Sequence, residues 1–485
     1  MADSVEYINH LLDEAGTPFR CYFSELKGRT LRMQADARAG DILFRGPLLH
    51  KVAADVRNPI YLELVKTFEM DRSCSLDYSP MWYWCGLNSL GFAVSPFVPV
   101  LPTEKVKQLK MLFHPRSTGP SRSIRILANA LSRFWTVSLT EEQLTEWDEM
   151  TVIWTLNCFE HADDPVTYAS FFLPSFMSHS CGPTAMWTTI ADVVFIRSQR
   201  GLQSGDELTV SYLSEDFGLR PISVRRNHLQ STKFFLCDCP RCTSPVDDTR
   251  GFRLPPTLGL PKTCFVRFPK FDECACGCIA KISLTEEELH DILSLEEELV
   301  ALVTEFDGSE KEDEISSRPE PELIGSDDAA ERLSDLIQRM GLFHWASIRG
   351  LYQLSEYYKS IASYPKAIEC IKQRIEGKRK YVRMTVPEMS SGLGWALEDL
   401  GDVVLLHVSG SVAAGLSEEA RERFRDNWNP RSNEDLETLR ASGAMEAYTE
   451  AYNIVRNIFG TEHEHAVTVE MKIRRLQERL RVVFI

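Results

Sequence analysis

Three cysteines within six residues are the feature that most limits how this chain folds. They form the pattern Cys237-x-Cys239-x-x-Cys242. A structural zinc ion takes four protein ligands in a tetrahedron, so the triplet needs a fourth ligand from elsewhere in the chain, and Cys181 is the candidate. Buried cysteines without metal are the alternative, which this density of thiols disfavours. We expect Cys181, Cys237, Cys239 and Cys242 to form a closed structural zinc site.

A second group of cysteines follows the first. It consists of Cys264, Cys274, Cys276 and Cys278. Three cysteines at alternate positions turn toward a single ion only if the chain bends, and Gly277 offers that bend. A second zinc ion and unliganded thiols are therefore equally open interpretations of this group.

The thiols are interpreted as reduced because the N-terminus, MADSVEYINHLLDEAGTPF, lacks the basic start and apolar run of a signal peptide. We therefore expect an intracellular protein that is cytoplasmic, nuclear or both. No stretch of about 18 uninterrupted apolar residues is present, so we expect no membrane span.

Length and charge restrict the organisation and the partners. A chain of 485 residues is too long for one hydrophobic core. The net charge of -16 argues against nucleic acid as the main partner, because phosphate binding needs positive surface. An acidic protein instead suits a lysine-rich protein partner.

Hydrophobic patterning changes along the first half of the chain. Alternating apolar residues predict strands from Phe19 to Val52 and again from Phe171 to Tyr212, with a turn at Gln203–Asp206. Between them, residues 53–165 have helical texture interrupted by prolines. We expect a helical insert between two groups of strands.

The second half is predicted to be helical. Thr285 and Glu288 have the spacing of a capping box, which predicts a helix start. Residues 305–331 hold eleven acidic and two basic side chains, a composition typical of a solvated linker. Later apolar runs with a period of 3.6 predict a stack of antiparallel helices, resembling tetratricopeptide pairs although no clean 34-residue period appears.

Three motifs in a fixed order carry a family resemblance. They are Ser178-His179-Ser180-Cys181-Gly182-Pro183-Thr184, then Gly205-Asp206-Glu207-Leu208-Thr209-Val210-Ser211-Tyr212, then the cysteine triplet. In this order and spacing they resemble the SET methyltransferases, specifically the SMYD branch. Further similar segments are residues 27–32, 39–44, 152–157, 225–229 and 451–467.

The resemblance implies an α+β fold and an activity. The fold would be a SET core of small β-sheets in which one segment threads another. The implied parts are N-terminal SET strands (1–52), a helical insert (53–165), the SET core (166–230), a zinc-binding post-SET segment (231–280), a helix with an acidic linker (281–332) and a helical-repeat domain (333–485). The implied activity is protein-lysine N-methylation with S-adenosylmethionine, on a histone or another lysine-containing protein, and the helical domain is expected to recruit a protein partner.

The resemblance also implies roles for individual residues. Those implied to bind the cofactor are Lys27, Gly28, Arg29, Asn157, Ser178, His179, Tyr212 and Phe235, with Phe235 stacking on adenine. Tyr212 is implied to be catalytic. Methyl transfer needs a neutral lysine amine, whose ordinary pKa is about 10.4, and a desolvated aromatic channel beside a sulfonium lowers that pKa. The Tyr212 hydroxyl would orient the methyl group.

The sequence departs from the family at several positions. Ser178 and Thr184 replace two asparagines, and Thr30 replaces a glycine of the cofactor loop. The only cysteines between Gly46 and Met150 are Cys74 and Cys85. The MYND zinc finger of the SMYD branch, which has seven cysteines and a histidine, is therefore absent. Lys233 stands where relatives often carry an aromatic channel residue, which leaves the number of methyl groups added open.

These departures define two alternatives from other functional classes. One is a catalytically degenerate SET scaffold that acts through its helical repeats, and it is motivated by Thr30, Ser178 and Thr184. The other is a zinc-stabilised helical adaptor without cofactor, which leaves the segment 178–212 unexplained. The presence of Asn157, His179, Tyr212 and Phe235 favours the enzyme, since a scaffold needs none of them.

Overall fold

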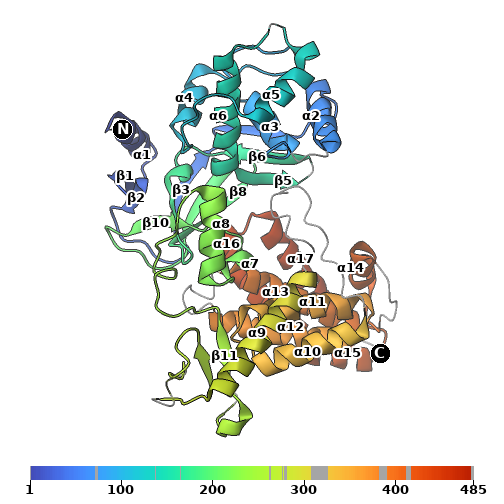
Figure 1. Ribbon diagram of the computed structural model, residues 1–485. Helices are drawn as coiled ribbons and strands as arrows, with labels where there is room; N and C mark the ends of the chain where they lie inside the picture. Colours follow the sequence, from blue (N-terminus) through green and yellow to red (C-terminus); the bar gives the residue numbers. More distant parts are fainter. Residues whose placement is uncertain are drawn as a thin grey trace. The chain divides into compact units, whose positions relative to one another are not determined.

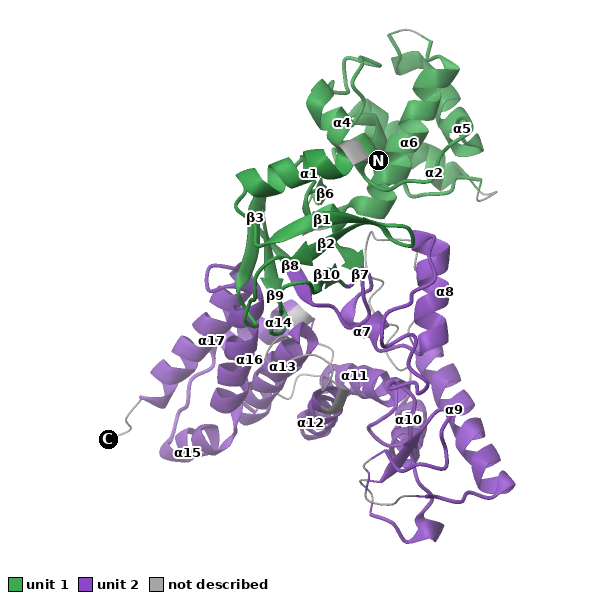
Figure 2. Cartoon of the chain, turned by 90° about the vertical axis from the view of Figure 1, so that its left-hand side faces the viewer, with its two compact units in different colours: residues 1–178, 187–210, 311–318 green, residues 179–186, 211–310, 319–485 purple. Residues whose placement is uncertain are grey.

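The computed structural model describes residues 2–71, 75–136, 138–163, 165–261, 264–275, 277, 281–306, 326–381, 390–410 and 417–481. The described residues form two compact units, coloured separately in Figure 2. The first unit contains residues up to 178 together with 187–210. The second contains residues 179–186, 211–306 and 326–481.

The strands before residue 211 form three small sheets. The orders are β1-β2-β10-β7, β3-β9-β8 and β4-β6-β5. The bounds are β1 (Phe19–Ser24), β2 (Gly28–Met33), β3 (Ile42–Pro47), β4 (His50–Ala53), β5 (Phe159–Asp163), β6 (Val166–Ser170), β7 (Ser178–His179), β8 (Ala185–Ile190), β9 (Val193–Ser198) and β10 (Glu207–Val210). Pairing of β2 with β10, Leu31 opposite Leu208, brings two segments far apart in sequence side by side.

Helices fill the long interval between β4 and β5. They are α2 (Pro59–Met70), α3 (Pro80–Leu87), α4 (Thr103–Met111), α5 (Arg122–Ala130), η1 (Ser132–Phe134) and α6 (Glu141–Asn157), while α1 (Ala2–Glu14) precedes β1 and η2 (Pro174–Phe176) precedes β7. Two fully buried tryptophans of α6 anchor this group. Trp147 donates from Nε1 to the Tyr83 carbonyl at 3.0 Å, and Trp154 donates to Ser89 Oγ at 2.7 Å. Both ring nitrogens are satisfied, as burial requires.

The structure confirms the strands predicted before residue 53 and the turn at Gln203–Asp206, where the Asp206 N–H donates to the Gln203 carbonyl. The prediction of helix up to residue 165 is wrong at its end. The strand β5 begins at Phe159, because residues 159–163 pair with β6 in an antiparallel ladder. Tertiary pairing decides the conformation of this short polar run, whose local pattern is weak.

The second unit is mainly helical (Figure 1). Its elements are α7 (Glu215–Gly218), α8 (Ile222–Lys233), β11 (Gly251–Arg253), η3 (Pro256–Leu258), β12 (Phe265–Arg267), α9 (Glu286–Phe306), α10 (Asp327–Met340), α11 (Trp345–Ser360), α12 (Tyr364–Tyr381), α13 (Ser391–Val408), α14 (Glu418–Asn427), α15 (Asn433–Ala441), α16 (Ala444–Phe459) and α17 (Glu464–Leu480). Strands β11 and β12 pair antiparallel.

Local sequence explains where these helices begin and how closely they pack. The predicted capping box is confirmed, because the Glu288 N–H donates to Thr285 Oγ1 and the Thr285 N–H donates to the Glu288 carboxylate. Gly401 allows α13 to approach α16, since a Cβ there would lie 2.5 Å from the buried Tyr448 ring. Most of the predicted acidic linker, residues 307–325, lies outside the described residues, and a tetratricopeptide relationship stays a prediction.

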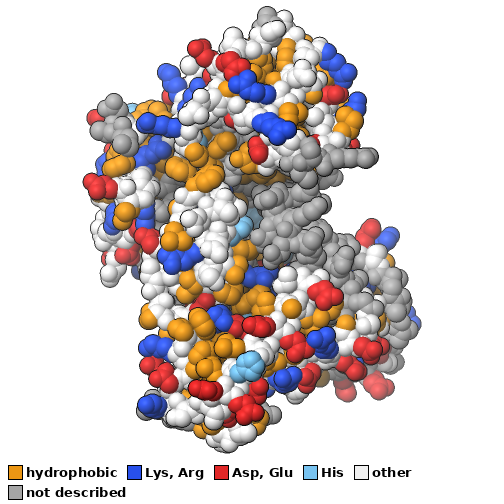
Figure 3. All heavy atoms as spheres, viewed as in Figure 1, with side chains coloured by type: hydrophobic (Ala, Val, Ile, Leu, Met, Phe, Trp, Pro, Cys, Tyr) orange, Lys and Arg blue, Asp and Glu red, His pale blue; other side chains and the backbone are white. Residues whose placement is uncertain are grey.

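One face of the described chain mixes both signs of charge. On the face drawn in Figure 3, basic side chains lie among acidic ones over the described residues. Across the described part of the chain, the helices all fall short of the length and apolarity needed to cross a bilayer.

His50 is a buried neutral histidine at the start of β4. Its Nε2 lies 2.9 Å from the Asn88 carbonyl oxygen, to which it donates, and its ring meets the edge of Trp154. Burial lowers the pKa of His50 to about 4 from an ordinary 6.5. The unfolded chain therefore binds a proton at this position at a higher pH than the folded chain does.

This difference predicts an acid-sensitive contribution of His50 to stability. The contribution is fully present above pH 6.5 and is lost as the pH falls from 6.5 toward 4. The part lost between pH 7 and pH 5 is about 1–2 kcal/mol of the free energy of unfolding. Calorimetric melting should show that the Tm falls less between pH 7 and pH 5 in His50→Gln than in the parent protein. The glutamine amide keeps a donor toward the Asn88 carbonyl. Equal losses in the two proteins would contradict the assignment.

Candidate active site and metal centre

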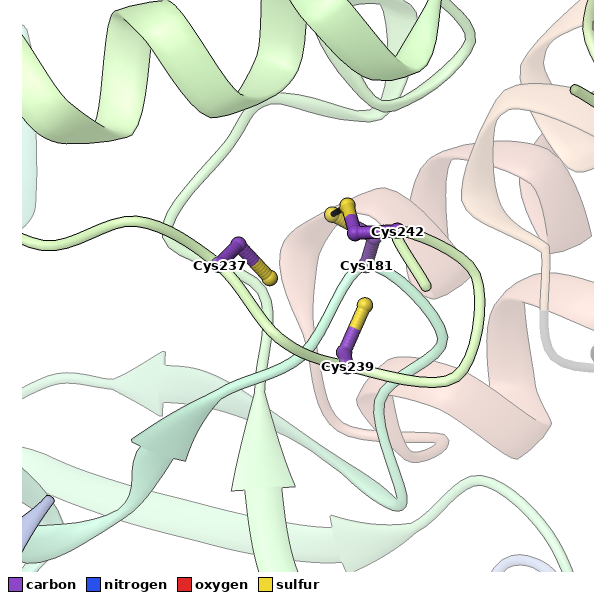
Figure 4. Close-up of side chains that lie close together, drawn as sticks. All are labelled: Cys181, Cys237, Cys239 and Cys242. Carbon is purple, nitrogen blue, oxygen red and sulfur yellow. Dashed lines mark hydrogen bonds between the residues drawn. The ribbon is translucent and has the colours of Figure 1, made fainter. Parts of the chain in front are cut away.

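Four cysteine side chains converge in the second unit (Figure 4). Cys181 lies in the loop after β7, and Cys237, Cys239 and Cys242 lie in the segment after α8. All four are buried, and their sulfur atoms lie within 4.8 Å of one another. Sulfurs around a tetrahedral zinc, with Zn–S bonds of about 2.3 Å, stand about 3.8 Å apart. The 3.5 Å between the sulfurs of Cys181 and Cys242 is close to that edge, so the residues fit a Cys₄ zinc site.

Titration of these thiols also suits a metal. Hydrogen bonds from Cys181, and then from Cys237 and Cys242, hold the pKa of the Cys239 thiol well below its ordinary range. Hydrogen bonds with Cys181, and then with Cys239 and Cys242, raise the pKa of the Cys237 thiol, because closely spaced sulfurs share protons. The cluster therefore favours a thiolate, the form of cysteine that binds zinc.

Two arginines hold the cluster together. Arg241 donates from Nη1 to the Cys181 carbonyl at 2.6 Å, and its guanidinium pairs with Asp248. Arg225, which is fully buried, donates from Nη2 toward Cys242 Sγ at 3.8 Å. Sequence reasoning missed Arg241 altogether, because its position inside the cysteine triplet carries no signal of the loop that it contacts.

Three aromatic rings lie beside the cluster in the same unit. His179 and Tyr212 have ring centroids 5.3 Å apart, and Phe235 lies 5.9 Å from His179 and 6.3 Å from Tyr212. Tyr212 occupies a turn after β10, in which the Leu213 N–H donates to Ser211 Oγ. The structure thus brings together three of the residues that the sequence assigned to the cofactor and to catalysis. Burial lowers the pKa of His179 to about 4, so its ring is neutral at pH 7.

The position of Phe235 depends on how α8 ends. Phe234 adopts a left-handed conformation, with φ of 61°, directly after the last helical residue. This conformation is uncommon for a residue with a side chain and stops the helix abruptly. The chain then turns into Phe235, which is half-buried, and the cysteine triplet follows at once.

Other predicted cofactor residues lie in the first unit. Lys27, at the turn between β1 and β2, pairs with Glu207 at 3.0 Å. Gly28 has φ of 72°, which a residue without Cβ adopts without strain. The Arg29 guanidinium carbon lies 4.8 Å from the centre of the Phe176 ring. Glu207 thus orders the loop through Lys27.

Asn157 and Ser178 are also in the first unit. Asn157, the last residue of α6, donates from Nδ2 to the carbonyls of Phe113 and Ile153 at 2.9 and 2.8 Å. Both amide hydrogens are therefore used within the protein, and its Oδ1 is the atom left to accept from a ligand. Ser178 is half-buried in β7.

Thr30 tests whether the departures from the family pattern exclude a ligand. It lies within β2 opposite Tyr22 and is outside the positive-φ region, so the position does not require glycine. Its side chain is buried, and Oγ1 has no hydrogen-bond partner among the described residues. A buried hydroxyl without a partner fits a place that a polar ligand completes.

The second cysteine group is only partly described. Cys264 and Cys274 are buried, and the Ala275 N–H donates to the Phe265 carbonyl at 2.8 Å, which joins the two segments. Gly277 has the positive φ that the predicted bend needs, 73°. Cys276 and Cys278 lie outside the described residues, so a second zinc stays a prediction.

Removal of one thiol from the cluster is expected to remove the zinc. Cys237→Ala should lose one zinc ion per chain and lower the Tm, because metal binding contributes directly to folding. Metal content by mass spectrometry and calorimetric melting measure both effects. Cys370→Ala removes a buried thiol from α12 and serves as the matched control, with zinc retained. Full zinc content in Cys237→Ala would disprove the site.

Comparison with known proteins shows which protein family part of the chain matches. Residues 28–213 match the model of the SET domain family. Similar proteins include "Histone-lysine N-methyltransferase SET5" of Vanderwaltozyma polyspora, 29% identical over 77 residues (16% of this chain and 15% of the relative), and "Histone-lysine N-methyltransferase ATXR4" of Arabidopsis thaliana, 35% identical over 81 residues (16% and 24%). "N-lysine methyltransferase SMYD2-A" of Xenopus laevis is 35% identical over 72 residues (15% and 16%).

The matched segments span less than a quarter of these relatives' own length. The solved structure of Rubisco LSMT bound to AdoMet aligns over 98% of this chain and 93% of that chain, at 11% identity and a TM-score of 0.27, a score at which two folds are not equated. The sequence match and the three small sheets agree with each other. This α+β chain therefore contains a SET domain, and its similar proteins include SET-domain methyltransferases.

Proposed function

We propose that the protein is a protein-lysine N-methyltransferase that uses S-adenosylmethionine. The observation that carries the proposal is the grouping of His179, Tyr212 and Phe235 beside the four-cysteine cluster, within a chain that contains a SET domain. The names of three similar proteins, two histone-lysine and one N-lysine methyltransferase, point to the same reaction class.

The chemistry requires positioning more than acid or base catalysis. The lysine nitrogen attacks the methyl carbon of the sulfonium, the carbon–sulfur bond breaks with its electrons going to sulfur, and the proton of the ammonium has already left to solvent. The nucleophile, the methyl group and the leaving sulfur must lie on one line. An aromatic wall that excludes water favours the neutral amine. In this proposal Tyr212 orients the reacting groups through its hydroxyl and Phe235 supplies a stacking face.

The family resemblance assigns cofactor contacts to eight residues. These are Lys27, Gly28, Arg29, Asn157, Ser178, His179, Tyr212 and Phe235. Thr30 supports the assignment through its buried hydroxyl without a partner. The zinc, held by Cys181, Cys237, Cys239 and Cys242, is structural, because four protein thiolates leave no open position for a substrate.

The finer identity of the protein is also part of the proposal. We place it with the SMYD type but without a MYND finger, given the two cysteines between Gly46 and Met150. The substrate is a lysine-containing protein, and the charge of -16 suits a basic segment on a histone or a non-histone protein. The helical unit is assigned to partner recruitment, in a cytoplasmic or nuclear setting.

Cofactor binding is the first test. Calorimetric titration of the zinc-loaded chain with S-adenosylmethionine should give a dissociation constant on the order of micromolar. Phe235→Ala should weaken it by about 10-fold or more, because a stacking face is worth about 1–3 kcal/mol. Leu236→Ala, at an exposed neighbouring position, is the matched control and should bind normally.

The catalytic assignment needs a separate variant. Tyr212→Phe keeps the ring against His179 and Phe235 but lacks the hydroxyl, so cofactor binding should persist while methyl transfer falls about 100-fold or more. Transfer of a labelled methyl group to a panel of basic proteins measures this. No cofactor binding up to millimolar concentration, in a folded and zinc-loaded chain, would favour the degenerate scaffold instead.

A further inference from the structure

The imidazole of His179 lies between the cysteine cluster and the backbone of Tyr212. Its Nε2 is 3.3 Å from Cys181 Sγ, and its Nδ1 is 2.9 Å from the Tyr212 backbone nitrogen. The ring is buried, and all three residues belong to the second unit. Both ring nitrogens are therefore engaged, one with a metal ligand and one with the proposed catalytic residue.

These contacts fix which ring nitrogen carries the proton. A backbone N–H can only donate, so Nδ1 must be the unprotonated acceptor for Tyr212. A neutral imidazole then holds its single proton on Nε2. That N–H has Cys181 Sγ within reach, and a zinc-bound thiolate is an acceptor. The direction of both hydrogen bonds follows from the Tyr212 amide alone.

We propose that His179 is a positioning residue that couples the zinc site to Tyr212. Its Nε2–H donates to the Cys181 thiolate, and its Nδ1 holds the amide of Tyr212 at a fixed place. The ring also packs against the rings of Tyr212 and Phe235, at interplanar angles of 49° and 50°, so one side chain orders the whole aromatic group. The role of this aromatic arrangement in catalysis rests on the proposed function. The two hydrogen bonds do not depend on that function.

Charge explains why the thiolates need such donors. A zinc ion with four thiolates carries a net charge of two minus, and burying it without compensation is costly. Arg225 supplies a buried cation that donates toward Cys242 at 3.8 Å. His179 donates a hydrogen bond to Cys181 as a neutral ring, so it adds no charge to the cluster. Outer donors of this kind orient metal ligands and stabilise the bound ion.

The proton position can be measured directly. The full chain, labelled with ¹⁵N-histidine and loaded with ¹¹³Cd in place of zinc, is expected to show His179 protonated at Nε2, with a scalar coupling from that proton to cadmium through the N–H···S bond. Comparison with His179→Asn identifies the resonance. Protonation at Nδ1, or at both ring nitrogens, at pH 7 would overturn the proposal.

Two substitutions separate the two hydrogen bonds. Asparagine places its oxygen near the Nδ1 position and has no group that reaches Cys181. Glutamine places its amide donor near the Nε2 position and loses the acceptor for Tyr212. His179→Asn should therefore release zinc to a chelator about 10- to 100-fold faster, with the Tyr212 amide resonance kept. His179→Gln should keep the release rate near that of the parent protein but shift the Tyr212 amide resonance.

Controls make failure interpretable. His290→Asn, at an exposed position on α9, should leave zinc release and the Tyr212 resonance unchanged. Equal behaviour of the Asn and Gln variants in both measurements would reduce His179 to a packing residue and overturn the proposal. If the two variants separate as expected but the parent protein transfers no methyl group, the coupling stands and the proposed function fails.

Discussion

The convergence of four sulfur atoms is the constraint on which the rest of the candidate site depends. Cys181 and Cys242 are 61 residues apart, and the segment between them includes β9, β10, α7 and α8. Closing such a loop costs chain entropy, and a metal bound by all four thiolates would offset part of that cost. His179 precedes one ligand by two residues and Phe235 precedes another by two. The position of the four cysteines therefore restricts where these aromatic side chains can lie.

A buried carboxylate of the second unit connects the segment after the cysteine cluster to the helices. Glu296 of α9 accepts from Arg250 and lies 3.0 Å from the fully buried His344 at the start of α11. Burial raises the pKa of Glu296, but hydrogen bonds from His344 and Arg250 outweigh it and lower that pKa to about 2. Loss of one partner from such a buried group costs about 3–5 kcal/mol. The segment that follows the zinc ligands is thus bound firmly to the helices by charge as well as by apolar packing.

Much of this organisation is predictable from sequence, for identifiable reasons. Alternation predicts the strands near residue 30, and the capping box at Thr285 predicts the start of α9, because both signals are local. The cysteine spacing predicts the metal cluster because tetrahedral coordination admits few arrangements. The resemblance to SET proteins was needed for the aromatic group, since an isolated tyrosine or phenylalanine is more often a packing residue.

What the sequence could not predict depends on contacts between distant segments. Arg241 holds the Cys181 loop, yet its own neighbourhood contains no sign of that partner. The strand β5 forms because β6 is present to pair with it, and its own residues suggest neither state strongly. The direction of the His179 hydrogen bonds required a backbone donor at Tyr212, which only the folded chain brings to it. Long-range geometry, more than composition, decides these details.

Thr30 is the residue that bears most directly on the alternative of a catalytically degenerate scaffold. From sequence alone, threonine in place of glycine suggests a damaged cofactor loop. In the structure the residue has ordinary strand geometry, and its buried hydroxyl has no partner among the described residues. Leaving such a group unpaired costs about 1–3 kcal/mol. A polar ligand at this strand would remove that cost. The threonine is therefore compatible with a cofactor contact at this position.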